Sequence, residues 1–406
     1  MKSQIRVALL TAGRDKPYAY GMATALISQA ISLDIIGGDD LDGSQWYGKP
    51  RVRFLNLRGD MRENTTFAQK VSRVLTYYVR LLLYATTARP KIFHILWNNK
   101  FETFDRVPLM LYYRLLGKKI VLTVHNVNSR TRDSNDTWLN RLTLKIQYRL
   151  ADHLFVHTQR MKTELVEQFG VQTSTISVVP FGINNAVPNT DLTDEEARRR
   201  LDLASNDRTI LFFGNIAPYK GLEFLVNAFR QIMEHGRPYR LIIVGNPKKC
   251  DAYWNDLQEI LRCHPNRDRI VQCIEYIPDD QTEVYFKAAD VLVLPYRYIY
   301  QSGVLFLGYS FGLPVIATEV GSLKEEIIEG KTGFISKPED STELAKVIEN
   351  YFSSDLYRNL KSHRQTIRDH ALQRYSWQVV GELTSKVYEG LVGKQWTSKG
   401  CQLVPR

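Results

Sequence analysis

Short apolar runs rich in β-branched residues alternate with longer amphipathic segments along most of the chain, and this alternation is the feature that most constrains the fold. Short β-branched runs are typical of strands, and apolar residues at helical spacing are typical of amphipathic helices. Strands that alternate with helices form parallel sheets with helices on both faces. We therefore expect an α/β protein.

The alternation occurs in two similar halves. In the first half the predicted strands are residues 5–11, 52–57, 92–97, 120–125, 153–158 and 175–180, with helices at 67–88, 103–116, 138–150 and 159–169. In the second half the predicted strands are residues 209–213, 241–244, 270–277, 291–294, 315–318 and 333–335, with helices at 222–235, 253–263, 281–288 and 304–311. Each half is expected to be a Rossmann-like, doubly wound parallel sheet with its ligand site at the carboxyl ends of the strands.

Changes in composition mark the boundaries between these parts. The stretch after Gly182 is rich in Asn, Asp, Thr and Glu, which predicts a linker with one short helix. We expect an N-terminal domain at 1–182, a linker at 183–207 and a second domain at 208–374. A last helix at 375–392 is expected to cross back to the first domain. Residues 393–406 are treated as a tail, because LVPR at 403–406 resembles a thrombin cleavage sequence.

The excess positive charge lies in the first half of the chain. Residues 1–180 hold 26 Lys and Arg against 14 Asp and Glu, whereas residues 181–406 hold 28 against 29. The positive electrostatic field of the first half favours an anionic partner, which could be nucleic acid, acidic lipid headgroups or a phosphorylated acceptor. Nucleic acid explains the charge but none of the motifs below, so no nucleic-acid partner is expected.

Two helical segments of the first half mix cationic side chains with aliphatic and aromatic ones. They are residues 67–89 and 110–119. This pattern suits a helix that rests on an anionic membrane surface, and it also suits an ordinary core helix with basic outer positions. No apolar run approaches the roughly 18 residues that span a bilayer, and the N-terminal apolar run is too short for a signal peptide. We expect a cytoplasmic protein with peripheral contact at the inner face of the cell membrane.

The junctions between strands and helices in the second half have the features of phosphate sites. Gly214 ends a strand-like run and Lys220 follows it, while Gln301-Ser302-Gly303 opens a later helix. The free N–H groups and the dipole of a helix N-terminus attract phosphate. A lysine beside such sites indicates a diphosphate ligand. The histidines and cysteines have no metal-ligand spacing, so no metal is expected.

Several short motifs follow one another along the chain in a definite order. They are Gly214 with Lys220-Gly221, the run 241–245, Ala289-Asp290 before Pro295, Gly312-Leu313-Pro314 with Gly321, and Gly330 with 332–334, preceded by 123–126, 151–154 and 178–182. No single motif is specific, but the ordered set resembles the retaining glycosyltransferases of family 4, which have the GT-B fold of two Rossmann-like domains that face each other across a cleft. The resemblance is strong from about residue 124 to residue 335.

The resemblance implies that the second domain binds a nucleotide-sugar and the first binds the acceptor. Lys220 and His125 are the implied catalytic residues: Lys220 holds the donor diphosphate, and His125 reaches the transferred sugar from the tip of a first-domain strand. The implied donor-binding residues are Gly214, Asn215, Lys220, Gly245, Tyr276, Ile277, Arg297, Gln301, Ser302, Gly303 and Val304. The predicted acceptor-binding residues are Gly13, Tyr18 and Gly21. The resemblance implies no metal and no cofactor, because the nucleotide-sugar is a co-substrate.

The chain departs from the family pattern at two places. Asn215 stands where the family has an arginine, so Lys220 or another basic residue, for which Arg297 is a candidate, must supply the charge. The family's two glutamates fall at Ile299 and Leu307, which leaves the group that holds the ribose unassigned.

Each singled-out residue also has a purely structural interpretation. Lys220 could be a surface lysine at a helix start, His125 a core or capping histidine, and Ser302 with Gly303 a simple helix cap. The acidic pair at Asp40 and Asp42 resembles a metal-binding motif of another glycosyltransferase fold, but we interpret it as a solvated turn.

The function we expect is transfer of a hexose-type sugar, with retention, to a lipid-linked or anionic saccharide acceptor, in bacterial surface polysaccharide or glycolipid assembly. A nucleotide-sugar epimerase and a phosphorylase are the enzymatic alternatives. A non-catalytic nucleotide-sugar sensor or subunit is an alternative of another class. A Rossmann dehydrogenase is disfavoured, because the turn at residues 11–15 lacks the G-x-G-x-x-G pattern.

Overall fold

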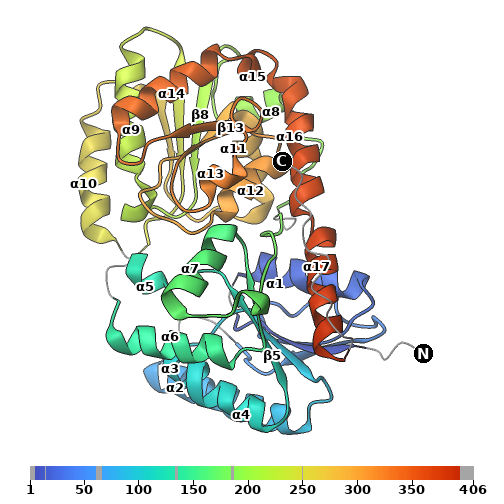
Figure 1. Cartoon of the computed structure of the whole chain (residues 1–406). Coiled ribbons are helices and arrows are strands. Elements are labelled where there is room, and N and C mark those ends of the chain that lie inside the picture. Colours follow the sequence, from blue (N-terminus) through green and yellow to red (C-terminus); the bar gives the residue numbers. More distant parts are fainter. Residues whose placement is uncertain are drawn as a thin grey trace. The chain divides into compact units, whose positions relative to one another are not determined.

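The computed structural model describes residues 5–13, 15–60, 66–132, 136–183, 187–248 and 250–393. The chain forms two compact units (Figure 1): unit 1 is Met1–Gly182 together with Trp377–Arg406, and unit 2 is Ile183–Ser376. The chain therefore leaves unit 1 after Gly182 and returns to it at Trp377. Apart from residue 393, the predicted tail lies outside the described residues.

Unit 1 contains a seven-stranded parallel sheet in the order β3-β2-β1-β4-β5-β6-β7. The strands are β1 (Arg6–Leu10), β2 (Ser32–Gly37), β3 (Val52–Asn56), β4 (Ile92–Ile95), β5 (Lys119–Val124), β6 (His153–Val156) and β7 (Ile176–Val178). The helices are α1 (Lys16–Ser28), α2 (Phe67–Thr87), α3 (Glu102–Phe104), the π-helical turn η1 (Asp105–Leu109), α4 (Met110–Leu115), α5 (Ser129–Arg132), α6 (Trp138–Leu150), α7 (Gln159–Phe169), the 3₁₀ turn η2 (Thr173–Thr175) and α17 (Trp377–Leu391).

Unit 2 contains a six-stranded parallel sheet in the order β10-β9-β8-β11-β12-β13. The strands are β8 (Arg208–Phe213), β9 (Tyr239–Val244), β10 (Ile270–Cys273), β11 (Val291–Leu294), β12 (Val315–Thr318) and β13 (Gly333–Ser336). The helices are α8 (Asp194–Arg200), α9 (Leu222–Met233), α10 (Asp251–Arg262), α11 (Asp279–Ala288), α12 (Gly303–Ser310), α13 (Leu323–Glu326), α14 (Ser341–Ser353), α15 (Asp355–Arg358) and α16 (Leu360–Tyr375), with 3₁₀ turns η3 (Pro218–Lys220) and η4 (Arg267–Arg269).

These sheets confirm the predicted fold class, two Rossmann-like doubly wound domains. The strand order reverses between β1 and β4 in unit 1 and between β8 and β11 in unit 2. Ligands of doubly wound sheets bind at the carboxyl ends of the strands beside such a reversal. Each unit therefore has one switch point at which a site is expected.

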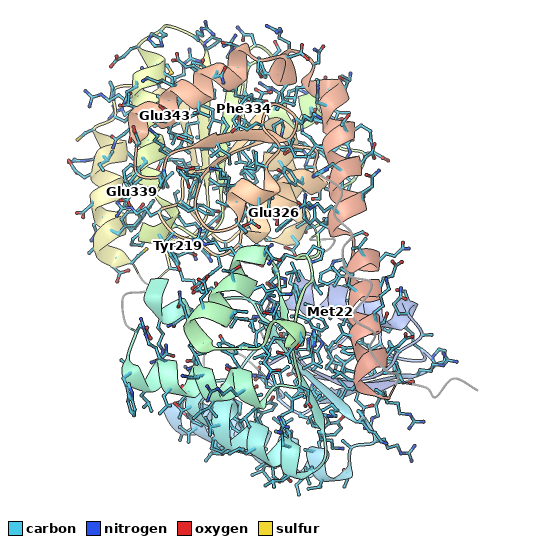
Figure 2. All side chains as sticks on the ribbon, viewed as in Figure 1. Met22, Tyr219, Glu326, Phe334, Glu339 and Glu343 are labelled. Carbon is cyan, nitrogen blue, oxygen red and sulfur yellow. The ribbon has the colours of Figure 1, made fainter. Side chains whose placement is uncertain are left out.

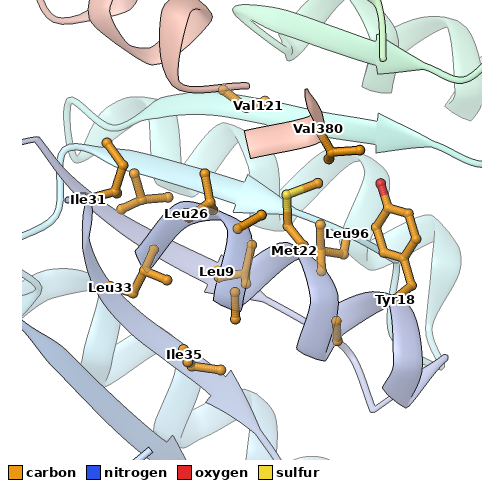
Figure 3. Close-up of a cluster of buried hydrophobic side chains, with 14 of the residues drawn as sticks. Leu9, Tyr18, Met22, Leu26, Ile31, Leu33, Ile35, Leu96, Val121 and Val380 are labelled. Carbon is orange, nitrogen blue, oxygen red and sulfur yellow. The ribbon is translucent and has the colours of Figure 1, made fainter. Parts of the chain in front are cut away.

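The core of unit 1 explains why the chain returns to it after unit 2. Helix α1 packs on the sheet through Met22 and Leu26, and Val380 of α17 joins the same cluster (Figure 3). Trp377, at the start of α17, occupies the space beside Gly21, where an added Cβ would lie only 1.9 Å from the indole ring. Close packing of α17 on α1 therefore requires glycine at position 21.

The structure corrects several predicted elements. The predicted helix at 103–116 is interrupted by the π-helical turn η1, which contains Pro108, because proline lacks the N–H that a regular helix needs. The predicted strand at 270–277 ends at Cys273. The predicted last helix begins at Trp377, because α16 ends at Tyr375 and Ser376 is extended.

The stretch predicted as a linker packs on unit 2. Thr190 donates hydrogen bonds from its N–H and its hydroxyl to Glu283, at 2.9 and 2.7 Å. Arg198 of α8 forms an ion pair with Asp290 at 3.4 Å. The described part of this stretch thus contributes to the compact body of unit 2.

Candidate functional site

The switch point of unit 2 brings the two predicted phosphate loops together. Strand β8 leads into Gly214 and the turn at Lys220, and β11 leads into Pro295 and the N-terminus of α12. A Cβ at Gly221, whose φ is +63°, would lie 2.1 Å from the carbonyl oxygen of Pro295. The two loops thus meet backbone to backbone. Figure 2 shows how the strand ends are arranged within unit 2. Toward one end lie Tyr219, Glu326 and Glu339, which follow strands β8, β12 and β13. Toward the other end lie Phe334 and Glu343.

Lys220 is buried at this junction and held by an aromatic hydroxyl. Its Nζ donates a hydrogen bond to the Tyr296 hydroxyl at 2.7 Å and lies 4.0 Å from the centroid of the same ring. Burial raises the pKa of Tyr296, so its hydroxyl stays protonated and can donate to Ser302 Oγ at 3.2 Å. This chain of contacts fixes a cation beside the start of α12.

The first turn of α12 offers hydrogen-bond donors at the same place. Ser302 is the N-cap but makes no side-chain cap bond, and the first-turn N–H groups of a helix have no acceptor within the helix. Both polar atoms of the Gln301 amide are buried and have no hydrogen-bond partner among the described residues. A buried amide without a partner is costly unless a ligand or water satisfies it. The arrangement presents one fixed positive charge and unpaired hydrogen-bond donors at one place, which is the chemistry that an anion would need.

Two glycines allow the backbone to pass closely at the ends of β8 and β9. Gly214 has φ +111° and Gly245 has φ +153°, and a Cβ at Gly245 would lie 1.8 Å from the Gly214 carbonyl oxygen. A Cβ at Gly214 would lie 3.4 Å from Val304 Cγ2. Any larger residue at position 245 would therefore force the two loops apart.

The other predicted donor residues lie in varied surroundings. Asn215 is exposed, and Arg297 contacts Glu223, which already balances its charge. Tyr276 is 74% exposed and Ile277 is buried, on the segment before α11. The positions of the missing glutamates, Ile299 and Leu307, are both buried and apolar. The roles predicted for these residues stay predictions.

His125 lies at the carboxyl end of β5 in unit 1, within an aromatic cluster. Its ring stacks on Trp97 with centroids 4.3 Å apart, and the Tyr18 ring meets it edge-on at 4.7 Å. Burial and the neighbouring His157 and His94 hold the pKa of His125 well below its ordinary value, while the Leu96 carbonyl opposes this shift. His125 is therefore neutral at physiological pH.

The hydrogen bonds of the cluster assign the tautomer of His125. His157 Nδ1 bonds to the Val179 carbonyl at 3.0 Å, and since a carbonyl only accepts, this nitrogen carries the proton. The other nitrogen of a neutral His157 must then accept, so His125 Nδ1 donates to it at 3.0 Å. His125 Nε2 is left as an unprotonated acceptor, buried and without a hydrogen-bond partner among the described residues. His125 lines a cavity of about 120 Å³ together with residues that include Asn98, Arg106 and Asn126.

The predicted acceptor residues surround the strained turn after β1. Ala12 has φ 54°, Gly13 φ 61° and Asp15 φ 39°, and left-handed backbone at residues other than glycine is typical of functional sites. Tyr18 is buried among the rings around His125. Gly21 instead packs against Trp377, which fills the space beside its Cα. Its predicted role in acceptor binding stays a prediction.

Three residues of these sites were not singled out from the sequence. Tyr296 directly follows a buried strand and Pro295, a position that could have been noticed. Arg58 follows β3, and its side chain lies 3.2 Å from the position of a Gly13 Cβ and donates to Asn99 at 3.2 Å. His157 is recognisable as the orienting partner of His125 only in three dimensions. Among the described residues, no group of three His, Cys, Asp or Glu is placed to hold a metal ion.

Comparison with known proteins places both units in one group of enzymes. The family model described as Glycosyltransferase Family 4 matches residues 17–187, and the model described as Glycosyl transferases group 1 matches residues 207–354. A D-inositol 3-phosphate glycosyltransferase of Corynebacterium aurimucosum is 26% identical over 274 residues, which are 65% of this chain and 63% of that protein. The match thus spans less than two thirds of that relative.

Two solved structures share the fold over nearly the whole chain. A sucrose-phosphate synthase from Thermosynechococcus elongatus superposes with a TM-score of 0.76 at 18% identity, covering 96% of this chain and 99% of that one. Anabaena Alr3699/HepE in complex with UDP-glucose gives a TM-score of 0.72 at 15% identity, covering 95% of this chain and all of that one (100%). At these identities the likeness shows the fold alone.

Proposed function

The chain belongs to the family 4 glycosyltransferases with the GT-B fold, and we propose that it transfers a hexose from a nucleoside-diphosphate sugar to a hydroxyl of a lipid-linked or anionic saccharide. The observation that carries the proposal is Lys220, a buried cation fixed by Tyr296 beside the N-terminus of α12. A diphosphate is the ligand whose charge this pair of features matches. The UDP-glucose bound by Alr3699/HepE supports a nucleotide-sugar donor.

In the proposed reaction, the bond between the sugar C1 and the diphosphate oxygen breaks, and a bond from C1 to the acceptor oxygen forms. Negative charge grows on the leaving diphosphate, where Lys220 and the α12 N–H groups would stabilise it without moving. The acceptor proton passes to the leaving phosphate on the same face of the sugar, which gives retention. His125 Nε2, as an unprotonated acceptor, would receive a hydrogen bond from a sugar hydroxyl.

An anionic acceptor fits the turn after β1. Arg58 places a guanidinium beside the Gly13 backbone at the switch point of unit 1, where a phosphate or carboxylate would be attracted. The name of the corynebacterial relative also specifies a phosphorylated acceptor. We place the reaction in surface polysaccharide or glycolipid assembly, at the cytoplasmic face of the bacterial membrane.

Calorimetric titration of the protein with UDP-, GDP- and ADP-sugars tests the donor site. We expect one nucleotide to bind, and Lys220→Ala to reduce its binding and the transfer rate by about 10²- to 10³-fold, the cost of a lost charge-stabilising donor. Tyr296→Phe keeps the ring and loses the hydroxyl, so a reduction of about tenfold or less is expected. Lys346→Ala, at an exposed lysine of α14, is the control and should bind as the wild type. Near-normal transfer by Lys220→Ala would contradict the site.

A non-catalytic nucleotide-sugar sensor is the second candidate, because Asn215 is uncharged and Ile299 and Leu307 replace the family glutamates with buried apolar groups. A sensor would bind the nucleotide-sugar and release neither free nucleotide nor a new glycoside. An epimerase would change the donor sugar with no acceptor present. Product analysis by mass spectrometry, with and without acceptor, separates these outcomes.

A further inference from the structure

We propose that unit 1 docks on an anionic lipid bilayer through the outward faces of α2, α4 and α6. The docking surface is defined by Val71, Leu75, Val79 and Leu83 of α2, Leu115 of α4 and Trp138 of α6. This proposal refines the peripheral location given above, but it depends on neither the donor site nor the transfer reaction.

Helix α2 carries aliphatic side chains on its outer face as well as on its inner face. Its inner face packs on the protein through buried residues such as Tyr77 and Leu81. Its outer face carries a row of aliphatic residues at a spacing of four, beside polar ones: Val71, Leu75, Val79 and Leu83 are 40%, 55%, 55% and 63% exposed. Helix surfaces that face only solvent are normally polar. This aliphatic row is therefore expected to have a partner in the cell.

The neighbouring helices extend this surface. The Tyr112 hydroxyl of α4 donates to the Leu82 carbonyl of α2 at 3.2 Å, and Arg114 of α4 donates to the Leu150 carbonyl of α6 at 2.8 Å. The three helices thus lie side by side (Figure 1). Leu115 is 86% exposed and Trp138 is 76% exposed. Large exposed apolar side chains on adjacent helices are typical of an interaction surface.

The charge of the three helices identifies the partner. Together α2, α4 and α6 contain seven Lys and Arg and no Asp or Glu. Arg80, Lys145 and Arg149 are exposed and have no ion-pair partner within the described ranges. Cationic and apolar side chains on one surface are complementary to acidic headgroups above acyl chains.

Two other occupants fit less well. A second copy of the chain would use the same patch on both subunits, so Arg80, Lys145 and Arg149 would face the same three cations of the other copy. A membrane-spanning role is not indicated either, because no helix among the described residues is long and apolar enough to cross a bilayer. The exposed leucines and Trp138 of the docking surface instead suit partial insertion at the level of the lipid headgroups.

Co-sedimentation of the full chain with lipid vesicles tests the proposal. We expect binding to phosphatidylcholine vesicles that contain phosphatidylglycerol, weak binding to phosphatidylcholine alone, and weaker binding at high salt. The triple variant Arg80→Gln, Lys145→Gln and Arg149→Gln should lose about fivefold in affinity per charge. The double variant Leu75→Glu and Leu83→Glu should lose binding to both vesicle types.

Matched variants on unit 2 provide the controls. Leu372 is 55% exposed, as Leu75 is, and Ile260 is 37% exposed, so Ile260→Glu with Leu372→Glu repeats the apolar-to-acid change elsewhere. This control should bind anionic vesicles as the wild type does. The proposal is overturned if the wild type ignores anionic vesicles or if Leu75→Glu with Leu83→Glu still binds. It is also overturned if sedimentation shows a dimer that the glutamates dissociate, with no binding to vesicles.

Discussion

Asp105 is a buried carboxyl in unit 1, and its burial outweighs the polar groups and the Arg58 cation that act on it. Burial raises its pKa to about 6, although hydrogen bonds from Asn99 and the Tyr78 hydroxyl oppose the shift. Its second oxygen has no hydrogen-bond partner among the described residues. The folded protein therefore holds a proton that the unfolded chain releases between pH 3.8 and about 6. Folding stability from this group falls as the pH rises through that interval.

Asp105→Asn should remove this dependence, because the amide resembles the protonated acid. We expect the variant to match the wild type near pH 4 and to exceed its free energy of unfolding above pH 6, by up to about 3 kcal/mol. Urea unfolding of both proteins across this range measures the difference. If the variant instead loses stability relative to the wild type as the pH rises from 4 to 8, Asp105 acts as a charged partner.

At the scale of elements, the packing of α1 against α17 depends on glycine. A Cβ at Gly21 would overlap the Trp377 indole at 1.9 Å, and one at Gly182 would approach the same ring at 2.5 Å. The indole also meets the Tyr18 ring at 5.2 Å, so displacing it disturbs the cluster around His125. A change in helix packing can thus reach the candidate site of unit 1.

Gly21→Ala should destabilise the protein by about 1–3 kcal/mol, the usual cost of overpacking a core. The same change in a Trp377→Leu background should cost less, because the smaller side chain leaves room for the methyl group. A double-mutant cycle from urea unfolding measures this coupling. If Gly21→Ala in that background is stable but raises the acceptor KM, the residue also contributes to acceptor binding. Additive costs would contradict the packing role.

Some elements were predictable from sequence and others were not, for local reasons. Strand β2 was missed because Asp34 interrupts its apolar run; in the structure Asp34 pairs with Arg53 of the next strand and accepts from the Tyr84 hydroxyl. Helix α1 was missed because it is buried on most of its surface and lacks an amphipathic period. Tyr296 and His157 acquire their roles from partners 76 and 32 residues away. Sequence spacing does not report such contacts.

At the scale of the whole molecule, the chain builds unit 1 from both of its ends. Helix α17 supplies Val380 and Tyr388 to the core, and the Tyr388 hydroxyl bonds to His94 Nδ1 of strand β4 at 2.5 Å. Unit 2 is one continuous segment between these parts. The stability of unit 1 should therefore depend on residues that follow unit 2.

Truncation tests this dependence. A chain that ends at residue 376 should lose the thermal transition of unit 1, because its core is left open, while residues 183–376 alone should fold and keep nucleotide-sugar binding. Differential scanning calorimetry and near-ultraviolet circular dichroism measure both. A chain that ends at residue 393 retains α17 and is the control. Full stability of the chain that ends at residue 376 would contradict the role of α17.

The sequence by itself determined the class of fold, the family and the positions of the glycine-containing loops at the strand ends, because these depend on short-range signals: β-branched runs, glycines at strand ends and a lysine before a helix. Tertiary structure alone decided how those signals combine. It buried Lys220 against Tyr296, oriented His125 through His157 and left Val71, Leu75, Val79 and Leu83 uncovered. The physical reason is that burial, tautomer and exposure depend on which side chains meet in space, and parallel sheets bring together residues that are distant in the chain.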